Sequence, residues 1–204
     1  MKSTVNIFTR DLSDPMDDVQ QKIKDKMIEV TNLKLTDKTS YHAYEEVYPF
    51  LLDKFVGKKC NMLEVGMSWG GGMKILSELF PESTIYGLDW NIGALKINVD
   101  DFSNMKIFEC SQTDPDLPNK VPMLDFVTED CSHQMPNSIA TFELLEPKLN
   151  PGGVYVIEDV YPEFYDDYCA DGRFDIYDVR DIKDRVDDVV AVYRKPNREQ
   201  VPKQ

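Results

Sequence analysis

Short apolar runs alternate with helix-like patterns along most of the chain. The runs lie at residues 60–66, 83–90, 105–110, 123–130 and 153–160. Helical spacing of apolar residues occurs at 70–80, directly after a glycine turn, and at 138–149. Strands that alternate with helices predict a doubly wound parallel sheet, in which ligands bind at the carboxyl ends of the strands. Two later runs, 174–180 and 187–195, predict a terminal hairpin-like pair.

The amino-terminal part of the chain has a different pattern. Residues 1–36 are polar, with one weakly amphipathic stretch at 19–33. Tyrosines and leucines recur at helical spacing in 40–55, where Pro49 is expected to kink or restart the helix. We therefore expect a single domain, with a helical cap over residues 1–56, a core over 57–195 and a polar tail over 196–204.

Composition narrows the classes of partner. The 204 residues include 23 Lys and Arg and 37 Asp and Glu, for a formal charge of −14. Such a chain should be repelled by nucleic acid and by anionic membranes, so a small molecule or a glycan is the expected substrate. The four cysteines show neither C-x-x-C pairing nor zinc spacing, which predicts reduced thiols. No signal-peptide core or membrane span is evident, so we expect a cytoplasmic protein; a homo-oligomer is compatible with the sequence.

The glycine turn "LEVGMSWGGG" follows the first apolar run and has the character of a cofactor site. Gly66, Gly70 and Gly71 would let a ligand approach the backbone, and Asp89 ends the next strand, where an acidic side chain can accept from ribose hydroxyls. The spacing is not G-x-G-x-x-G, which disfavours an NAD-dependent dehydrogenase. Glu64 beside the turn suits a cationic cofactor better than an anionic one.

Acidic side chains follow the fourth and fifth apolar runs. Asp130 ends the stretch "DFVTED", and Glu158 with Asp159 ends "VYVIED". Neighbouring parallel strands would bring these carboxylates together beside the cofactor corner, so Asp130 is also a candidate cofactor contact. Three carboxylates form a hard ligand set for Mg²⁺ or Mn²⁺, whereas the competing interpretation is a solvated acidic surface. His133, three residues after Asp130, is the candidate general base.

Three further features are open to two interpretations. Ser111 and Gln112, in "CSQTD", could bind the base or ribose of the cofactor or belong to an ordinary polar loop. His42 could line the pocket or cap the tyrosine-rich helix. A predicted substrate loop after Asp159 carries aromatic side chains that could stack on a sugar ring or simply pack. These side chains are Tyr161, Phe164, Tyr165 and Tyr168.

Taken in order, several of these segments resemble a known enzyme family. E-x-G-x-x-x-G-G followed by an acidic strand end resembles the first two motifs of class I S-adenosylmethionine-dependent methyltransferases. More narrowly, the chain resembles the metal-dependent sugar O-methyltransferases of macrolide biosynthesis over about residues 36–195. The segments that carry this resemblance are "TDKTSYHAY", "LFPESTIYGLDW", "CSQTD", "EDCSH" and "GGVYVIEDV". The chain departs from the family at Glu129, where an aspartate is usual, and at Cys131, where glycine is common.

The resemblance implies a Rossmann-like α/β domain with a seven-stranded, mostly parallel sheet, helices on both faces and an antiparallel last strand. It implies methyl transfer from S-adenosylmethionine to a sugar hydroxyl. The metal ligands would be Asp130, Glu158 and Asp159, and His133 would be the base. Two alternatives remain open at this point: a catechol-like or other small-molecule diol as acceptor, and a cofactor-binding module without catalysis. The chain could also be one domain of a larger glycan-assembly protein.

Overall fold

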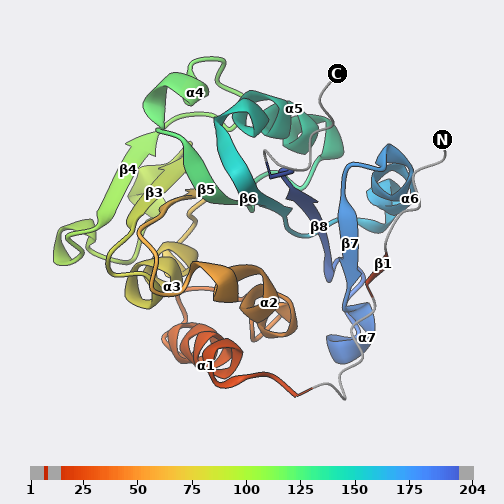
Figure 1. The fold of residues 1–204 in the computed structure, drawn as a ribbon, viewed down its shortest axis with the longest axis horizontal. Helices are drawn as coiled ribbons and strands as arrows, with labels where there is room; N and C mark the ends of the chain where they lie inside the picture. The colour runs from red at the N-terminus through yellow and green to blue at the C-terminus, as the bar shows by residue number, and fades with distance from the viewer. Residues whose placement is uncertain (1–6, 9–14, 198–204) are drawn as a thin grey trace.

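The computed structural model describes residues 7–8 and 15–197 and contains one mixed sheet (Figure 1). The strands follow the spatial order β1-β7-β8-β6-β5-β2-β3-β4. Their bounds are β1 (Ile7–Phe8), β2 (Asn61–Val65), β3 (Thr84–Asp89), β4 (Met105–Glu109), β5 (Leu124–Glu129), β6 (Leu149–Ile157), β7 (Asp175–Asp178) and β8 (Val189–Arg194). The end of the predicted polar tail, residues 198–204, lies outside the described residues.

The strand directions confirm the predicted fold. Strands β2 to β6 are parallel to one another, whereas β8 runs antiparallel to both of its neighbours, β6 and β7. The seven expected strands are β2 to β8, and the last two form the expected antiparallel pair. The two-residue β1 adds an eighth strand, parallel to β7 at the edge of the sheet.

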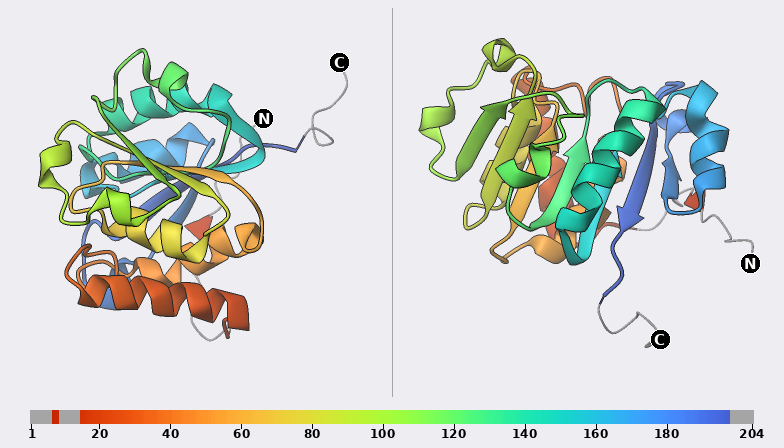
Figure 2. Two further views of the ribbon diagram at one scale, coloured as in Figure 1. Left: turned by 90° about the vertical axis from the view of Figure 1, so that its left-hand side faces the viewer. Right: turned by 90° about the horizontal axis from the view of Figure 1, so that it is seen from above.

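Helices cover both faces of the sheet. α1, α2 and α3 lie on one face, and α4 and α5 lie on the other (Figures 1 and 2). The α-helices are α1 (Asp18–Asn32), α2 (Tyr48–Leu52), α3 (Gly71–Leu79), α4 (Leu117–Lys120), α5 (Met135–Leu145), α6 (Pro162–Asp171) and α7 (Arg180–Lys183). Short 3₁₀ turns are η1 (Tyr44–Glu46), η2 (Asp53–Phe55), η3 (Ile92–Ala94), η4 (Val99–Asp101) and η5 (Glu146–Lys148). No helix of the described residues is long and apolar enough to cross a membrane.

Local sequence explains both helices of the amino-terminal cap. Asp17 and Gln20 form a capping box at the start of α1, which satisfies backbone N–H groups that would otherwise lack partners. The helix buries Ile23, Met27 and Val30, which share one face. The second pattern is interrupted as expected: a 3₁₀ turn precedes α2, and Pro49 lies in the first turn of that helix, where its missing N–H costs nothing.

Two segments expected to be loops contain helices. The segment 111–122, which begins with the possible polar loop of Ser111 and Gln112, includes the one-turn helix α4. The predicted substrate loop after Asp159 is largely α6, whose Tyr168 is buried and packs edge-on against Phe174 at 5.7 Å between ring centroids. The prediction of a loop here was therefore wrong, because burial of Tyr168 provides an apolar face around which a helix can form.

Alternation along the strands creates a separate core on each face of the sheet. Phe126 and Val154 pack with the cap helices and α3, whereas Val127 and Tyr155 pack with α5 and α6. The cap shares the first of these cores, since Ile23, Met27, Tyr48 and Leu52 belong to the same cluster as the strand residues. The alternation continues to the strand ends, so the polar residues there are also divided between the two faces.

Candidate active site

The glycine turn after β2 is fixed by Asp89. The carboxylate accepts from the backbone N–H groups of Met67 at 2.9 Å and Ser68 at 3.1 Å, and its other oxygen accepts from Asn91 N–H at 2.9 Å. Asp89 is 8% exposed and lines a cavity of about 370 Å³. A carboxylate oxygen has two acceptor sites, so these bonds leave room for a ligand hydroxyl.

The three predicted glycines have internal structural roles. A Cβ at Gly66, where φ is +91°, would overlap the carbonyl oxygen of Asp130, and a Cβ at Gly71 would overlap the carbonyl of Leu35. Gly70 has the same φ of +91° and precedes α3 as its left-handed cap. Gly66 lines both cavities described below and Gly71 lines the second, whereas Gly70 lines neither. Close packing of the chain against itself, rather than ligand approach alone, therefore requires glycine here.

Two cavities meet at the carboxyl end of the sheet. The first, about 370 Å³, is lined by Asp89, Trp90, Ser111 and Gln112 among others. The second, about 300 Å³, is lined by Lys38, Glu64, His133 and Asp159 among others. Four residues line both cavities: Gly66, Ser68, Asp130 and Cys131. The candidate cofactor residues and the candidate metal residues therefore occupy adjoining spaces, with Asp130 between them.

Glu64 carries a buried carboxylate oxygen without a partner. The residue is 2% exposed, and Oε2 has no hydrogen-bond partner within the described part of the chain. Burial raises the pKa of Glu64 to about 8, an effect that the charge of Lys38 only partly offsets. A cationic group bound in the second cavity would satisfy this oxygen and restore the charged form.

The two side chains predicted to contact the cofactor base or ribose, Ser111 and Gln112, differ in exposure and in their hydrogen bonds. Ser111 is exposed at the rim of the first cavity, where its hydroxyl contacts Thr113. Gln112 uses its amide nitrogen to donate to Glu129 Oε1 at 3.1 Å and to Thr141 Oγ1 at 3.2 Å. Gln112 is thus held in place on the α5 side of the sheet, and burial raises the pKa of its partner Glu129 to about 7.

Asp130, His133 and Asp159 form a compact group of possible metal ligands. Each offers a ligand atom, and these atoms lie within 4.8 Å of one another. His133 Nε2 is 3.9 Å from Asp130 Oδ1, and His133 Nδ1 is 3.8 Å from Asp159 Oδ2. His133 and Asp159 both have left-handed backbones, with φ of 52° and 53°, as does Ser68 in the same cavity. Backbone strain of this kind is typical of functional sites.

Glu158, the third predicted ligand, lies outside this group. It is 1% exposed, and its Oε1 accepts from Thr128 Oγ1 at 2.9 Å and from the Tyr48 hydroxyl. Its Oε2 accepts from Lys38 Nζ. Glu158 follows the alternation of Val154 and Val156, whose side chains face the cap. Its side chain therefore bonds to the cap residues Tyr48 and Lys38. Burial raises its pKa to about 7 despite Lys38.

The other two carboxylates are held in different electrostatic environments. Burial would raise the pKa of Asp130, but the charge and the 2.8 Å hydrogen bond of Lys38 hold it below its ordinary value. Burial raises the pKa of Asp159 to about 6, and the nearby charge of Asp130 acts in the same direction. Asp159 accepts from the Tyr44 hydroxyl through Oδ1, which leaves Oδ2 facing His133.

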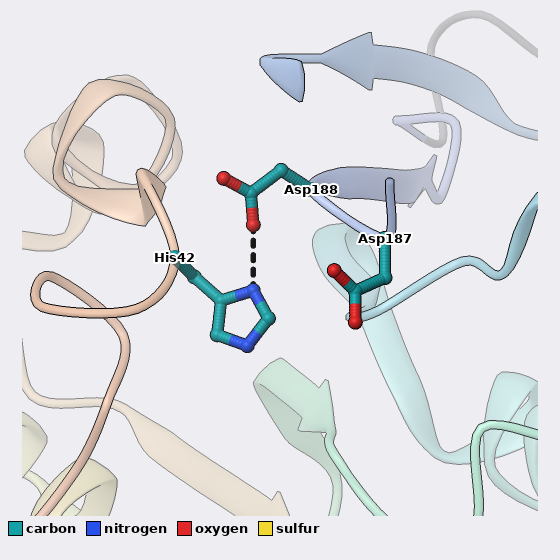
Figure 3. Close-up of side chains that lie close together, drawn as sticks. All are labelled: His42, Asp187 and Asp188. Carbon is teal, nitrogen blue, oxygen red and sulfur yellow. Dashed lines mark hydrogen bonds and ion pairs between the residues drawn. The ribbon is translucent and has the colours of Figure 1, made fainter. Parts of the chain in front are cut away.

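His42 lines neither cavity, but it contacts two residues of the site, Asp159 and Tyr44. Its Nδ1 is 2.6 Å from Oδ1 of the fully buried Asp188 and 3.6 Å from Asp159 Oδ1, and its ring stacks on Tyr44 at 5.0 Å. Figure 3 shows the imidazole reaching from the cap toward Asp188 and Asp187, which precede β8. Burial alone would lower the pKa of His42, but the Asp188 hydrogen bond and the Asp159 charge raise it to about 9. Together His42, Asp187 and Asp188 form a second group of possible metal ligands.

Three residues of the site escaped sequence reasoning: Lys38, Tyr44 and Tyr48. Tyr44 and Tyr48 fit the helical spacing of the cap, so their hydroxyls were not assigned a role. In the structure both phenols donate to carboxylates at the strand ends, and burial raises their pKa values well above the ordinary value. The polar residues of "TDKTSYHAYEEVY" were the available signal, because a cap that packs on a sheet must also provide hydrogen-bond partners for its buried polar atoms.

The aromatic side chains near α6 divide into one site neighbour and three packing residues. The ring of Tyr161 lies 5.7 Å from that of His133. Phe164 and Tyr165 pack at the margin of the second core, where Arg180 covers the Tyr165 ring at 4.6 Å, and Tyr168 is buried. Tyr161 is therefore the member of this set that contacts the candidate base.

Comparison with known proteins supports the resemblance stated above. No family model matches the chain. The chain is 27% identical over 158 residues to an 8-demethyl-8-alpha-L-rhamnosyl tetracenomycin-C 2'-O-methyltransferase from Streptomyces olivaceus. The aligned region covers 68% of this chain and 39% of that protein. The chain is also 27% identical over 184 residues to a demethylmacrocin O-methyltransferase from Streptomyces fradiae. That aligned region covers 80% of this chain and 44% of the relative. The chain thus spans less than half the length of these curated relatives.

Solved structures give the same picture for the fold. The MycE methyltransferase of the mycinamycin pathway, solved with Mg, SAH and mycinamycin VI, superimposes with a TM-score of 0.64 at 22% identity. The match covers 88% of this chain and 57% of that one. A precorrin-6y C5,15-methyltransferase from Geobacter metallireducens GS-15 gives a TM-score of 0.53 at 19% identity, over 71% of this chain and 79% of the other. This chain has a methyltransferase-like fold, and in sequence it is similar to sugar O-methyltransferases of macrolide and polyketide biosynthesis.

Proposed function

We propose that the chain catalyses methyl transfer from S-adenosylmethionine to a sugar hydroxyl with the help of a divalent cation. The observation that carries this proposal is the pair of adjoining cavities joined at Asp130. One contains the acidic strand end Asp89, and the other contains His133 and Asp159. A methyl donor and a hydroxyl acceptor must be held side by side for in-line transfer, and two connected spaces suit that requirement.

The residues present fit S-adenosylmethionine. Asp89 borders the first cavity, where it would accept from ribose hydroxyls, and Ser111 at the rim would contact the base or ribose. Glu64 lines the second cavity and has a buried, unpartnered oxygen, with which a cationic amino acid moiety bound there would pair. The bound cofactor would supply an electrophilic methyl group, while these side chains orient it.

The residues present also fit Mg²⁺ or Mn²⁺. Oδ1 of Asp130 and Oδ2 of Asp159 are turned toward His133, whose Nδ1 is buried with no hydrogen-bond partner among the described atoms. Carboxylate oxygens are the preferred ligands of these hard cations. We propose Asp130 and Asp159 as ligands, with Glu158 as the third carboxylate. A bound cation would act as a Lewis acid toward the acceptor oxygen.

His133 is proposed as the general base. It lies between the two free carboxylate oxygens in the second cavity, with Tyr161 beside its ring. An imidazole there can remove the proton of an acceptor hydroxyl while the carboxylates stabilise the charge that it gains. The sugar as acceptor is supported by the names of the similar proteins, which methylate rhamnosyl and macrolide sugars.

We also propose a single domain, a cytoplasmic location and weak affinity for nucleic acid. A single domain is supported by the hydrophobic cluster that the cap and the sheet share. A cytoplasmic location is supported by the four free cysteines. Weak affinity for nucleic acid is expected from the formal charge of −14.

A screen of glycosides with radiolabelled S-adenosylmethionine tests the function directly. Label should enter a sugar glycoside in the presence of Mg²⁺ or Mn²⁺, and excess chelator should abolish the transfer. Catechols in parallel reactions provide the comparison of acceptor class. Full activity in excess chelator would contradict the metal proposal, and exclusive labelling of catechols would contradict the sugar.

A further inference from the structure

Lys38 places a buried ammonium group among the carboxylates of the proposed metal site. Its side chain is 5% exposed, and Nζ contacts Asp130 Oδ2 at 2.8 Å and Glu158 Oε2. A buried lysine is stable only when it is paired, and this one is paired with two of the three proposed ligands. The proposed reaction assigns no task to this cation.

Both oxygens of Glu158 accept hydrogen bonds, and Oε2, which accepts only from Lys38 among the described residues, keeps an acceptor site that a metal could use. Oε1 accepts from Tyr48 and Thr128, which face it from the cap and from β5. Oε2 accepts from Lys38. By contrast, Asp130 keeps Oδ1 and Asp159 keeps Oδ2 turned toward His133. A divalent cation on Oε2 would stand beside the ammonium of Lys38, and repulsion between the two positive charges favours release of that oxygen by Lys38 when Glu158 ligates the cation.

The charge balance of the cluster favours such an exchange. Glu64, Asp130 and Asp159 line the same cavity as Lys38, and Glu158 contacts the ammonium of Lys38. Carboxylates held this close repel one another unless a cation separates them. The ammonium of Lys38 provides one positive charge for this purpose, whereas a divalent cation provides two.

We propose that Lys38 is an internal counter-cation that shares Glu158 with the divalent metal. In the metal-free protein Lys38 keeps Asp130 and Glu158 together, and metal binding transfers Glu158 Oε2 from the ammonium to the cation. Lys38 is thus a positioning residue that preserves the shape of the site and weakens its metal affinity. This inference rests on the metal site of the proposed function.

The backbone around Lys38 is anchored, so the exchange requires movement of the side chain only. Lys38 N–H donates to Thr36 Oγ1 at 3.3 Å, and its carbonyl accepts from Tyr44 N–H at 3.0 Å. The lysine side chain has rotatable bonds along its whole length. Because it reaches into a cavity of about 300 Å³, the ammonium has space to move away from Glu158.

Calorimetric titration of Mn²⁺ into the metal-free protein tests the sharing. Lys38→Met should bind Mn²⁺ about tenfold more tightly than wild type, and Glu158→Gln should bind it more weakly. In the Glu158→Gln background, Lys38→Met should change the affinity by less than about twofold, because the shared oxygen is gone. Lys24→Met is the matched control, since Lys24 is also a paired cap lysine but contacts Glu46. If Lys38→Met increased Mn²⁺ affinity equally in the wild-type and Glu158→Gln backgrounds, the sharing would be overturned. Lys38 would then act only through long-range repulsion of the cation.

Amine labelling of the wild-type protein gives a second measurement that needs no Lys38 variant. Reductive methylation followed by peptide mass spectrometry should show Lys38 protected without metal and labelled with saturating Mn²⁺. The exposed Lys58 should be labelled equally in both conditions. Unchanged protection of Lys38 when Mn²⁺ is bound would overturn this inference and leave the proposed function standing. Absence of any Mn²⁺ binding to wild type would overturn the metal site and this inference together.

Discussion

His133 Nδ1 lies 3.8 Å from Asp159 Oδ2, and both residues have a left-handed backbone. The two side chains come from different strand ends and meet in one cavity with Asp130. The imidazole therefore has two possible tasks, as the base that accepts a proton or as a nitrogen ligand of the cation. Substitutions of His133 and Asp159 separate these tasks. Substitutions of Asp89 and His42 test the cofactor site and the stability of the folded protein.

His133→Ala is expected to lower turnover by roughly 10²–10⁴-fold, the usual contribution of a positioned proton transfer. Affinities for Mn²⁺ and for S-adenosylhomocysteine should be retained, because the two carboxylates and Asp89 are unchanged. Single-turnover kinetics with calorimetry of both ligands checks this. A variant that loses Mn²⁺ binding would show that His133 is a ligand, and near-normal turnover would show that it is only structural.

Asp159→Asn is expected to weaken Mn²⁺ binding by at least about tenfold, since loss of a ligand should cost no less than loss of an outer-shell partner. S-adenosylhomocysteine affinity should change little, because the first cavity does not include Asp159. Asp187→Asn is the control, since Asp187 belongs to the second acidic group with His42. If Asp187→Asn were the variant that lost Mn²⁺, the cation would bind in that second group instead.

Asp89→Asn is expected to weaken S-adenosylhomocysteine binding by about 10- to 100-fold, or about 1–3 kcal/mol. The carboxylate both faces the cavity and accepts from Met67 and Ser68 N–H groups, so its loss affects the ligand and the turn. Calorimetry measures the affinity of wild type and variant for S-adenosylhomocysteine and for NAD. Asp100→Asn is the control, because Asp100 is exposed. Tight NAD binding with no response to S-adenosylhomocysteine would refute the cofactor proposal.

His42 should make stability depend on pH. Its pKa is raised from 6.5 to about 9 in the folded protein, so the folded state binds more protons between these values. The stabilisation is present in full below pH 6.5 and should be lost as the pH rises through about 9. In metal-free protein, the advantage of wild type over His42→Gln should fall by about 2–3 kcal/mol across this window, as measured by urea unfolding. An advantage that stayed constant from pH 6 to 10 would show that His42 is not charged in the native state.

The strand pattern was predictable from the sequence because burial of both faces imposes long apolar runs on parallel strands. The same reasoning located Asp89, Asp130, Glu158 and Asp159 at the strand ends. It failed for residues 162–171, where the helix α6 replaces the predicted aromatic loop. Four charged and six apolar or small positions there give no clean period, so packing of Tyr168 against Phe174 had to decide the conformation.

The sequence by itself determined which side chains reach the carboxyl edge of the sheet and, through the alternation of the strands, which face each one takes. Only the tertiary structure decided how those side chains are paired. Lys38, Tyr44 and Tyr48 lie in the cap, and they meet Glu158 and Asp159 across more than a hundred residues of chain. Such pairings depend on how the cap settles on the sheet, a contact governed by non-directional apolar packing that local patterns do not encode.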